Sequence, residues 1–128
     1  MIVIIAAIIA VVVFGVVSII QLLLALGKPI GKLAYGGKYE TLPNNMRIMS
    51  VGAIGILALG AISVLERSGI ITILNNQILT LVIVWIIALY LAFNTVINVI
   101  SKSMKEKLIM TPLSLISSIC CFIVAILA

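Results

Sequence analysis

The stretch that decides the fold is residues 2–26, which read IVIIAAIIAVVVFGVVSIIQLLLAL. It contains no charged residue, and its polar side chains are Ser18 and Gln21. A helix needs about 20 consecutive apolar residues to cross the hydrocarbon core of a bilayer, so this stretch is long enough to span a membrane. The apolar core of a signal peptide has only about 7–15 residues and follows a basic segment. Because no Lys or Arg precedes Lys28, we expect a retained helix.

The composition of the chain points to lipid as its solvent. Hydrophobic residues make up 65% of the 128 residues and charged residues 9%, whereas a soluble domain carries about 25% charged residues. Eight Lys and Arg stand against three Glu, which gives a net charge of +5. The cations lie in short loops between apolar runs, and this pattern favours lipid headgroups over nucleic acid as a partner.

Three further stretches are long and apolar enough to cross a membrane. We predict an all-α transmembrane four-helix bundle that forms one domain over residues 1–128. The predicted spans are about 2–26, 48–65, 78–99 and 108–128.

The predicted helix ends rest on capping and breaking residues. Gly27 ends the first helix, and Asn44 and Asn45 cap the second. The start of the fourth helix stays open. Thr111 and Pro112 fit an N-cap and a first helical position, but a helix that begins earlier and kinks at Pro112 fits as well.

The distribution of cations predicts the orientation of the bundle. Only Arg67, which we expect to pair with Glu66, lies in the second loop. The other seven cations lie in or beside the first and third loops, and the positive-inside rule puts these loops in the cytoplasm. We therefore expect a multi-pass protein of the cell membrane with both termini extracytoplasmic. The lysines expected to contact lipid headgroups are Lys28, Lys32, Lys38, Lys102, Lys105 and Lys107.

The first loop is rich in glycine, with the sequence GKPIGKLAYGGKYETLPNN over residues 27–45. Its four glycines and two prolines argue against a long helix. Its Leu and Tyr residues suit a membrane interface. Two interpretations stay open: a structured loop that closes the cytoplasmic end of the bundle or docks a partner, and a connector that rests on lipid.

Two motifs resemble those of an uncharacterised group of small bacterial four-helix integral membrane proteins. The first is Gly-Lys-Pro-x-Gly-x-Leu-Ala-x-Gly-Gly over residues 27–37, followed by Leu42-Pro43 and Arg47. The second joins Asn98, Ile100 and Ser101 to Thr111-Pro112. The resemblance covers most of the chain and implies a bacterial origin, but it implies no activity.

Uncharged polar residues gather in the half of the spans that we place toward the cytoplasm. Because helical residues four apart share a face, these side chains form polar faces on the third and fourth spans. They fit hydrogen bonds that hold the helices together, or a polar cavity that opens toward the cytoplasm. The candidate cavity residues are Gln21, Tyr90, Asn94, Asn98, Ser114, Ser117 and Ser118.

The second span carries a ridge of small residues, Gly52, Gly55, Ala58 and Ala61. Small residues allow helix backbones to approach closely, so we expect this ridge to be the packing centre of the monomer or the seam of a dimer.

The functional expectation is correspondingly broad. The chain has no His, no pair of carboxylates and no nucleophile beside a base, so we expect neither an enzyme nor a bound cofactor or metal. The favoured hypothesis is a structural or accessory protein that packs with itself or with a larger membrane complex. The alternatives are an oligomeric channel or transporter for small solutes, and a module that binds lipid or a small amphiphile in a cytoplasm-facing cavity.

Overall fold

The computed structural model describes residues 1–31, 39 and 41–128, and its elements are four α-helices. Each helix is long and apolar enough to cross a membrane. The prediction of an all-α fold with four candidate spans is therefore confirmed. The helices are α1 (Ile2–Ala25), α2 (Asn44–Arg67), α3 (Gln77–Val99) and α4 (Met104–Leu127).

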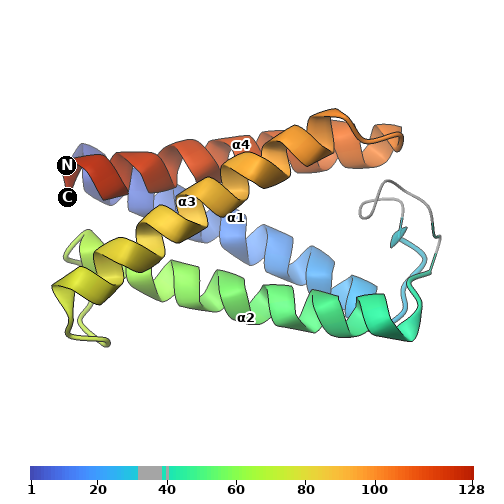
Figure 1. The fold of residues 1–128 in the computed structure, drawn as a ribbon, viewed down its shortest axis with the longest axis horizontal. Helices are drawn as coiled ribbons and strands as arrows, with labels where there is room; N and C mark the ends of the chain where they lie inside the picture. Colours follow the sequence, from blue (N-terminus) through green and yellow to red (C-terminus); the bar gives the residue numbers. More distant parts are fainter. Residues whose placement is uncertain (32–38, 40) are drawn as a thin grey trace.

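The four helices run alternately up and down, so the N- and C-termini lie at the same end of the molecule (Figure 1). We call this the terminal end and the opposite end, with the α1–α2 and α3–α4 connections, the loop end. The two hairpins, α1–α2 and α3–α4, are joined mainly by packing of α1 against α4. Neighbours α2 and α3 pack less extensively: they meet at the terminal end and diverge toward the loop end (Figure 1).

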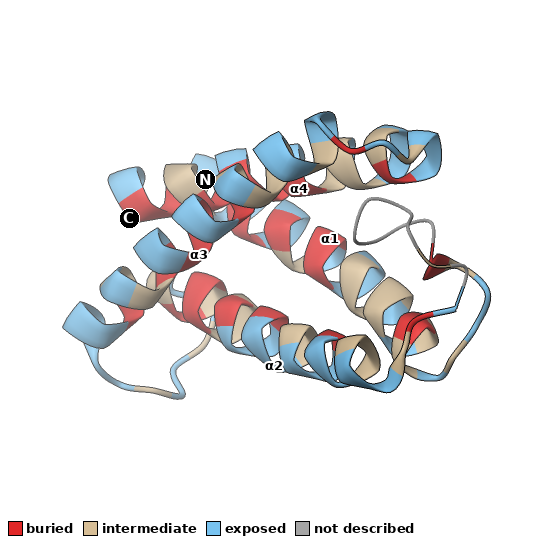
Figure 2. Ribbon diagram, turned by 45° about the vertical axis from the view of Figure 1, so that its right-hand side comes forward, coloured by how far each residue is buried: buried red, intermediate tan, exposed pale blue. Residues whose placement is uncertain are grey.

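The apolar core fills the terminal half of the bundle (Figure 2). Ala7 of α1, Val64 of α2, Val84 of α3 and Val124 of α4 are each fully buried there. The outward faces of the helices instead carry many exposed large apolar side chains. Because soluble monomers rarely expose contiguous apolar surface of this extent, these faces fit contact with lipid.

Two helices end in the same way at a glycine with positive φ. After α1, Gly27 has φ +84°, its N–H bonds to the Leu24 carbonyl, and the next N–H bonds to the Leu23 carbonyl. After α2, Gly69 has φ +88°, its N–H bonds to the Glu66 carbonyl, and the next N–H bonds to the Leu65 carbonyl. This is the Schellman arrangement, which satisfies the last carbonyls of a helix and favours glycine at the left-handed position.

Arg47 ties the loop ends of α1 and α2 together. Its Nε donates to the Ala25 carbonyl over 2.8 Å, and its guanidinium lies against Gly27. A cation is favourable at the C-terminal end of a helix, where carbonyl groups lack helical partners. The first hairpin is therefore fixed by a side chain of α2 that caps α1.

The start of α4 settles the alternative that the sequence left open. The helix begins at Met104, and the Ser103 hydroxyl caps it by accepting a 3.3 Å hydrogen bond from the Glu106 N–H. The helix therefore runs through Pro112, which excludes the alternative that it starts at Thr111. Similarly α2 begins at Asn44, after an N-cap at Pro43, which puts Asn44 and Asn45 inside the helix.

Glu66 and Arg67 do not pair with each other as expected. The Glu66 carboxylate is buried and accepts backbone N–H groups of residues 73–75 over 2.5–2.9 Å. Arg67 instead donates to the Gln77 side chain and to the Ala128 backbone oxygen, both at 2.9 Å. These two adjacent side chains fix the connection between α2 and α3 and hold it to the end of α4.

The small residues of α2 do not form the packing centre of the monomer. Among the described residues, a Cβ added at Gly52 or Gly55 would meet no atom within 4 Å, and Ala58 is exposed. Ala61 is half-buried against the core, and α2 approaches α3 closely at Gly60, where an added Cβ would lie 3.4 Å from the Ile87 side chain. Gly52, Gly55 and Ala58 are therefore exposed, whereas Ala61 packs against the core. A role as a dimer seam stays a prediction.

Candidate functional site

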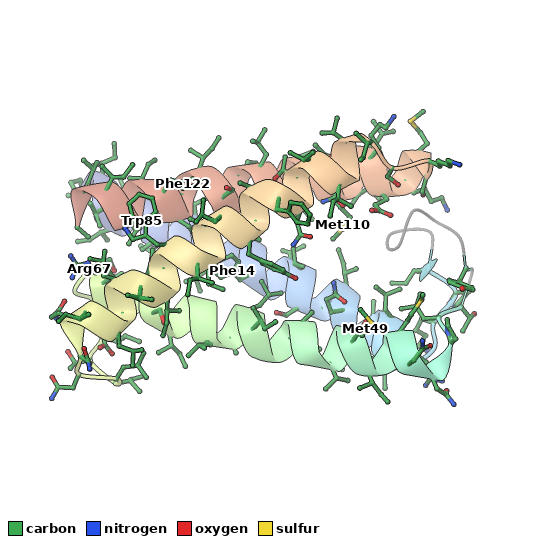
Figure 3. The ribbon with its side chains drawn as sticks, in the orientation of Figure 1. Phe14, Met49, Arg67, Trp85, Met110 and Phe122 are labelled. Carbon is green, nitrogen blue, oxygen red and sulfur yellow. The ribbon has the colours of Figure 1, made fainter. Side chains whose placement is uncertain are left out.

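A cavity of about 480 Å³ lies between the four helices in the loop-end half of the bundle. Toward the terminal end it is bounded by core residues, among them Phe14, Leu57 and Leu91. Toward the loop end it reaches Met49 on α2 and Met110 on α4, which lie on opposite sides of it (Figure 3). We call it the loop-end cavity. Its volume is in the range of about 300–1,000 Å³ that is typical of small-molecule sites.

The structure brings six of the seven candidate polar residues to this one cavity. Ser118 is the exception: it is buried away from the cavity and donates to the Ala88 carbonyl of α3 over 3.1 Å. The six that line the cavity are Gln21, Tyr90, Asn94, Asn98, Ser114 and Ser117.

Part of this polar wall holds α3 and α4 together. The Asn98 amide and the Thr95 hydroxyl both donate to Ser114 Oγ, over 3.2 and 3.1 Å. Ser114 itself donates back to the carbonyls of its own helix. Interhelical hydrogen bonding therefore accounts for Asn98, Ser114 and Ser118, in agreement with one of the two interpretations offered by the sequence.

The rest of the polar wall faces the cavity without such bonds. No hydrogen bond joins the side-chain amide of Gln21 or Asn94 to another described residue, although both side chains are half-buried. An amide in an apolar environment is costly unless it finds a donor or acceptor. Gln21 on α1 and Asn94 on α3 thus present hydrogen-bonding groups to whatever occupies the cavity.

Glu106 is a cavity residue that the sequence analysis missed. It lies in the first turn of α4, is only 3% exposed and lines the loop end of the cavity. The prediction that the fourth span starts near residue 108 left it in the loop. The spacing of Ser103 and Glu106 is that of a capping box, and this signal identifies the earlier helix start.

The remaining wall is apolar and adaptable. Phe14, Val17, Ile56 and Leu91 provide rigid hydrocarbon surface, and Met49 and Met110 add flexible thioethers that adjust to irregular shapes. A mostly apolar cavity with a few converging polar groups is the usual form of a small-molecule site. Within the part of the chain that the structure describes, no cluster of His, Cys, Asp and Glu fits a metal ion.

The cations gather near the same end of the molecule as the cavity. Among the described residues, Lys28, Lys102 and Lys105 are exposed there, Lys107 is half-buried, and Arg47 caps α1. Arg67 lies at the terminal end. Lys32 and Lys38, predicted to contact headgroups, and the pair Gly36-Gly37 lie outside the described residues.

Comparison with known proteins adds no family or homologue. No protein family, no curated protein and no solved structure matches the chain. Four apolar helices are compatible with the resemblance to small bacterial membrane proteins, which stays a prediction. The functional argument therefore rests on the loop-end cavity itself.

Proposed function

We propose that this small multi-pass membrane protein binds an amphipathic small molecule in the loop-end cavity. The observation that carries the proposal is the mixed wall of that cavity. Apolar side chains such as Phe14 and Leu57 line it toward the middle of the bundle, and Gln21, Asn98 and Glu106 line it toward the loop end. A molecule with an apolar body and a polar end matches this order of side chains.

The sequence alone favoured a structural or accessory role over ligand binding. The cavity is the reason that we now rank ligand binding first. A protein that acts only by packing its helices together needs no space among them, since helix interfaces are normally filled to the density of a crystal. Here the divergence of α2 and α3 leaves about 480 Å³ beside two amides that bond to no described residue. Binding gives both the space and the amides a use.

The accessory role remains the second candidate because of the outward face of α2. Gly55 and Ala58 are exposed there, and a Cβ added at Gly55 would meet no atom within 4 Å. Small residues on a lipid-facing surface favour close packing against another transmembrane helix. Replacement of Ala58 by Leu should then reduce self-association in detergent, and an unchanged oligomeric state would exclude self-association through this face.

In the cell we place the loop end in the cytoplasm and the termini outside it. This placement rests on the positive-inside rule, since five of the six described cations lie at the loop end. The cavity then belongs to the cytoplasmic half of the bilayer. Its ligand is accordingly proposed to be a molecule present in that leaflet or reaching it from the cytoplasm.

Occupancy of the cavity is testable with a tryptophan placed inside it. The only natural tryptophan, Trp85, packs edge-on against Phe122 outside the cavity, so Trp85→Phe silences the background at small structural cost. Phe14→Trp then puts an indole on the cavity wall at a position only 2% exposed. The cavity beside it gives room for the larger ring.

The probe is a maltoside detergent with bromine atoms on its alkyl chain. Bromine quenches indole fluorescence only at short range, so a buried indole is quenched when the chain enters the cavity. We expect strong quenching in brominated micelles and none in micelles of the unbrominated detergent. Fluorescence that is equal in both micelles would show that amphiphiles do not enter, and it would overturn the proposal.

A further inference from the structure

The walls of the loop-end cavity differ in how far they reach the molecular surface. The residues contributed by α1 and α4 form its floor: Phe14, Ser114 and Ser117 are buried, and Gln21 and Met110 are half-buried. The exposed residues contributed by α2 and α3 form its rim. Their exposed fractions are 56% for Met49, 44% for Ile56, 40% for Tyr90 and 40% for Ile97.

The mouth of the cavity therefore opens sideways, between α2 and α3. These are the neighbouring helices that pack least and diverge toward the loop end (Figure 1). Gly52 contributes to the opening from the α2 side, since it lines the cavity and is exposed. A Cβ added at Gly52 would meet no atom within 4 Å. A side chain at this position would project into the mouth.

The surface around this mouth is apolar. Met49 and Ile56 on α2 and Ile97 on α3 are exposed apolar side chains of the rim itself. All three lie inside helices that are long and apolar enough to span a membrane. An opening with such a border faces hydrocarbon chains rather than water.

We propose that the ligand is a membrane lipid, and that its acyl chain enters the loop-end cavity from the bilayer through the gap between α2 and α3. The chain lies against Phe14 and Leu57. The polar headgroup stays at the loop end, near Gln21, Asn98 and Glu106 and within the region of the exposed lysines. This inference rests on the proposed function, and it adds the class of ligand and the route of entry.

The test uses the Phe14→Trp, Trp85→Phe protein in bilayers and compares two quenchers. One is phosphatidylcholine with bromine atoms near the ends of its acyl chains, and the other is acrylamide, which dissolves in water. Lipid entry between α2 and α3 predicts strong quenching by the brominated lipid and weak quenching by acrylamide. Lipids brominated close to the headgroup should quench less, because Phe14 lies at the inner end of the cavity.

A matched pair of variants tests the route of entry. Gly52→Leu fills the mouth, whereas Gly55→Leu adds the same side chain one turn away on α2, at an exposed position that does not line the cavity. Neither position has an atom within 4 Å of the added Cβ, so both variants should fold. We expect Gly52→Leu to abolish quenching by the brominated lipid and Gly55→Leu to leave it unchanged.

The outcomes separate this inference from the proposed function. Quenching by acrylamide but not by brominated lipid would overturn the lipid entry, while quenching by brominated detergent would still support an amphiphile site. Equal quenching in both leucine variants would also overturn the route between α2 and α3. If Phe14→Trp does not fold, Leu91→Trp reports on the same cavity from α3, where Leu91 is only 6% exposed.

Discussion

Ser114 shows how one hydroxyl group at the cavity wall can hold two helices together. It accepts hydrogen bonds from Asn98 and Thr95 of α3 and donates to carbonyls within α4. Ser117 lies one turn farther along α4 and also lines the cavity, and its hydrogen bonds to described residues go to carbonyls of its own helix. The two serines therefore share an environment but differ in interhelical bonding.

Replacement of these serines by alanine should separate the two roles. Ser114→Ala removes the acceptor of the Asn98 amide, whereas the Thr95 hydroxyl keeps the Leu91 carbonyl of its own helix at 2.8 Å. We expect it to lower the free energy of unfolding by about 0.6 kcal/mol and by at most about 1.7 kcal/mol, the range for interhelical hydrogen bonds in membranes. Ser117→Ala should change it little. Unfolding in mixed micelles with increasing sodium dodecyl sulfate measures both, and equal losses would contradict this account.

At the scale of single residues, spacing identified much of the candidate site. Tyr90, Asn94 and Asn98 are four residues apart, so one helix face had to carry all three. Spacing could not show that Asn98 would bond to Ser114 while Asn94 would bond to no described residue. That difference depends on the distance between α3 and its neighbours, which no local pattern encodes.

At the scale of helices and their ends, Gly27 and Gly69 form a natural comparison. Each glycine lies just after the end of a helix and has a positive φ, +84° at Gly27 and +88° at Gly69. A Cβ at Gly69 would meet no atom within 4 Å, but a Cβ at Gly27 would lie 3.3 Å from the Arg47 guanidinium. The same substitution therefore combines backbone strain with a tight contact to a neighbouring side chain at Gly27 but not at Gly69.

Gly69→Ala should cost about 1–2 kcal/mol of stability, the penalty of an L-residue in the left-handed region. Gly27→Ala should cost more, because Arg47 must move and its hydrogen bond to Ala25 is strained. Thermal unfolding in detergent measures both variants. If the additional loss of stability in Gly27→Ala comes from Arg47, it should disappear when the substitution is made in an Arg47→Ala background. An additional loss that persists in that background would contradict this explanation.

The existence of the helices was predictable because long apolar runs leave few alternatives in lipid. Their ends were less predictable, since capping residues compete. Asn44 and Asn45 are common N-caps but lie inside α2, and Thr111-Pro112 resembles a helix start but lies inside α4. The cap at Ser103 explains the difference in α4, and it adds Glu106 to the cavity wall.

At the scale of the whole molecule, the divergence of the hairpins decides the site. The positions of the polar residues along the spans predicted a polar half of the bundle, and the small residues of α2 suggested a packing centre or a dimer seam on that helix. The helices instead separate at the loop end, so Gly52 lies at the mouth of a cavity. Relative helix orientation depends on the sum of many weak contacts, and periodicity in a single sequence does not determine it.

The proposed orientation is testable by cysteine labelling in intact cells. Thr72 is exposed in the α2–α3 connection at the terminal end, and Lys105 is exposed at the loop end. A membrane-impermeant maleimide should label Thr72→Cys from outside and Lys105→Cys only after the cells are opened. Cys120 and Cys121 are buried, so the unchanged protein should stay unlabelled. The reverse pattern would place the loop end outside the cell.

The most direct test of the central claim, that the loop-end cavity holds a lipid, is native mass spectrometry. The protein is released from lipid nanodiscs of phosphatidylethanolamine and phosphatidylglycerol. We predict that the unchanged chain and Gly55→Leu each retain the added mass of a single lipid, whereas Gly52→Leu is released without it. Release of all three as the bare polypeptide, or the same lipid mass on all three, would contradict the claim.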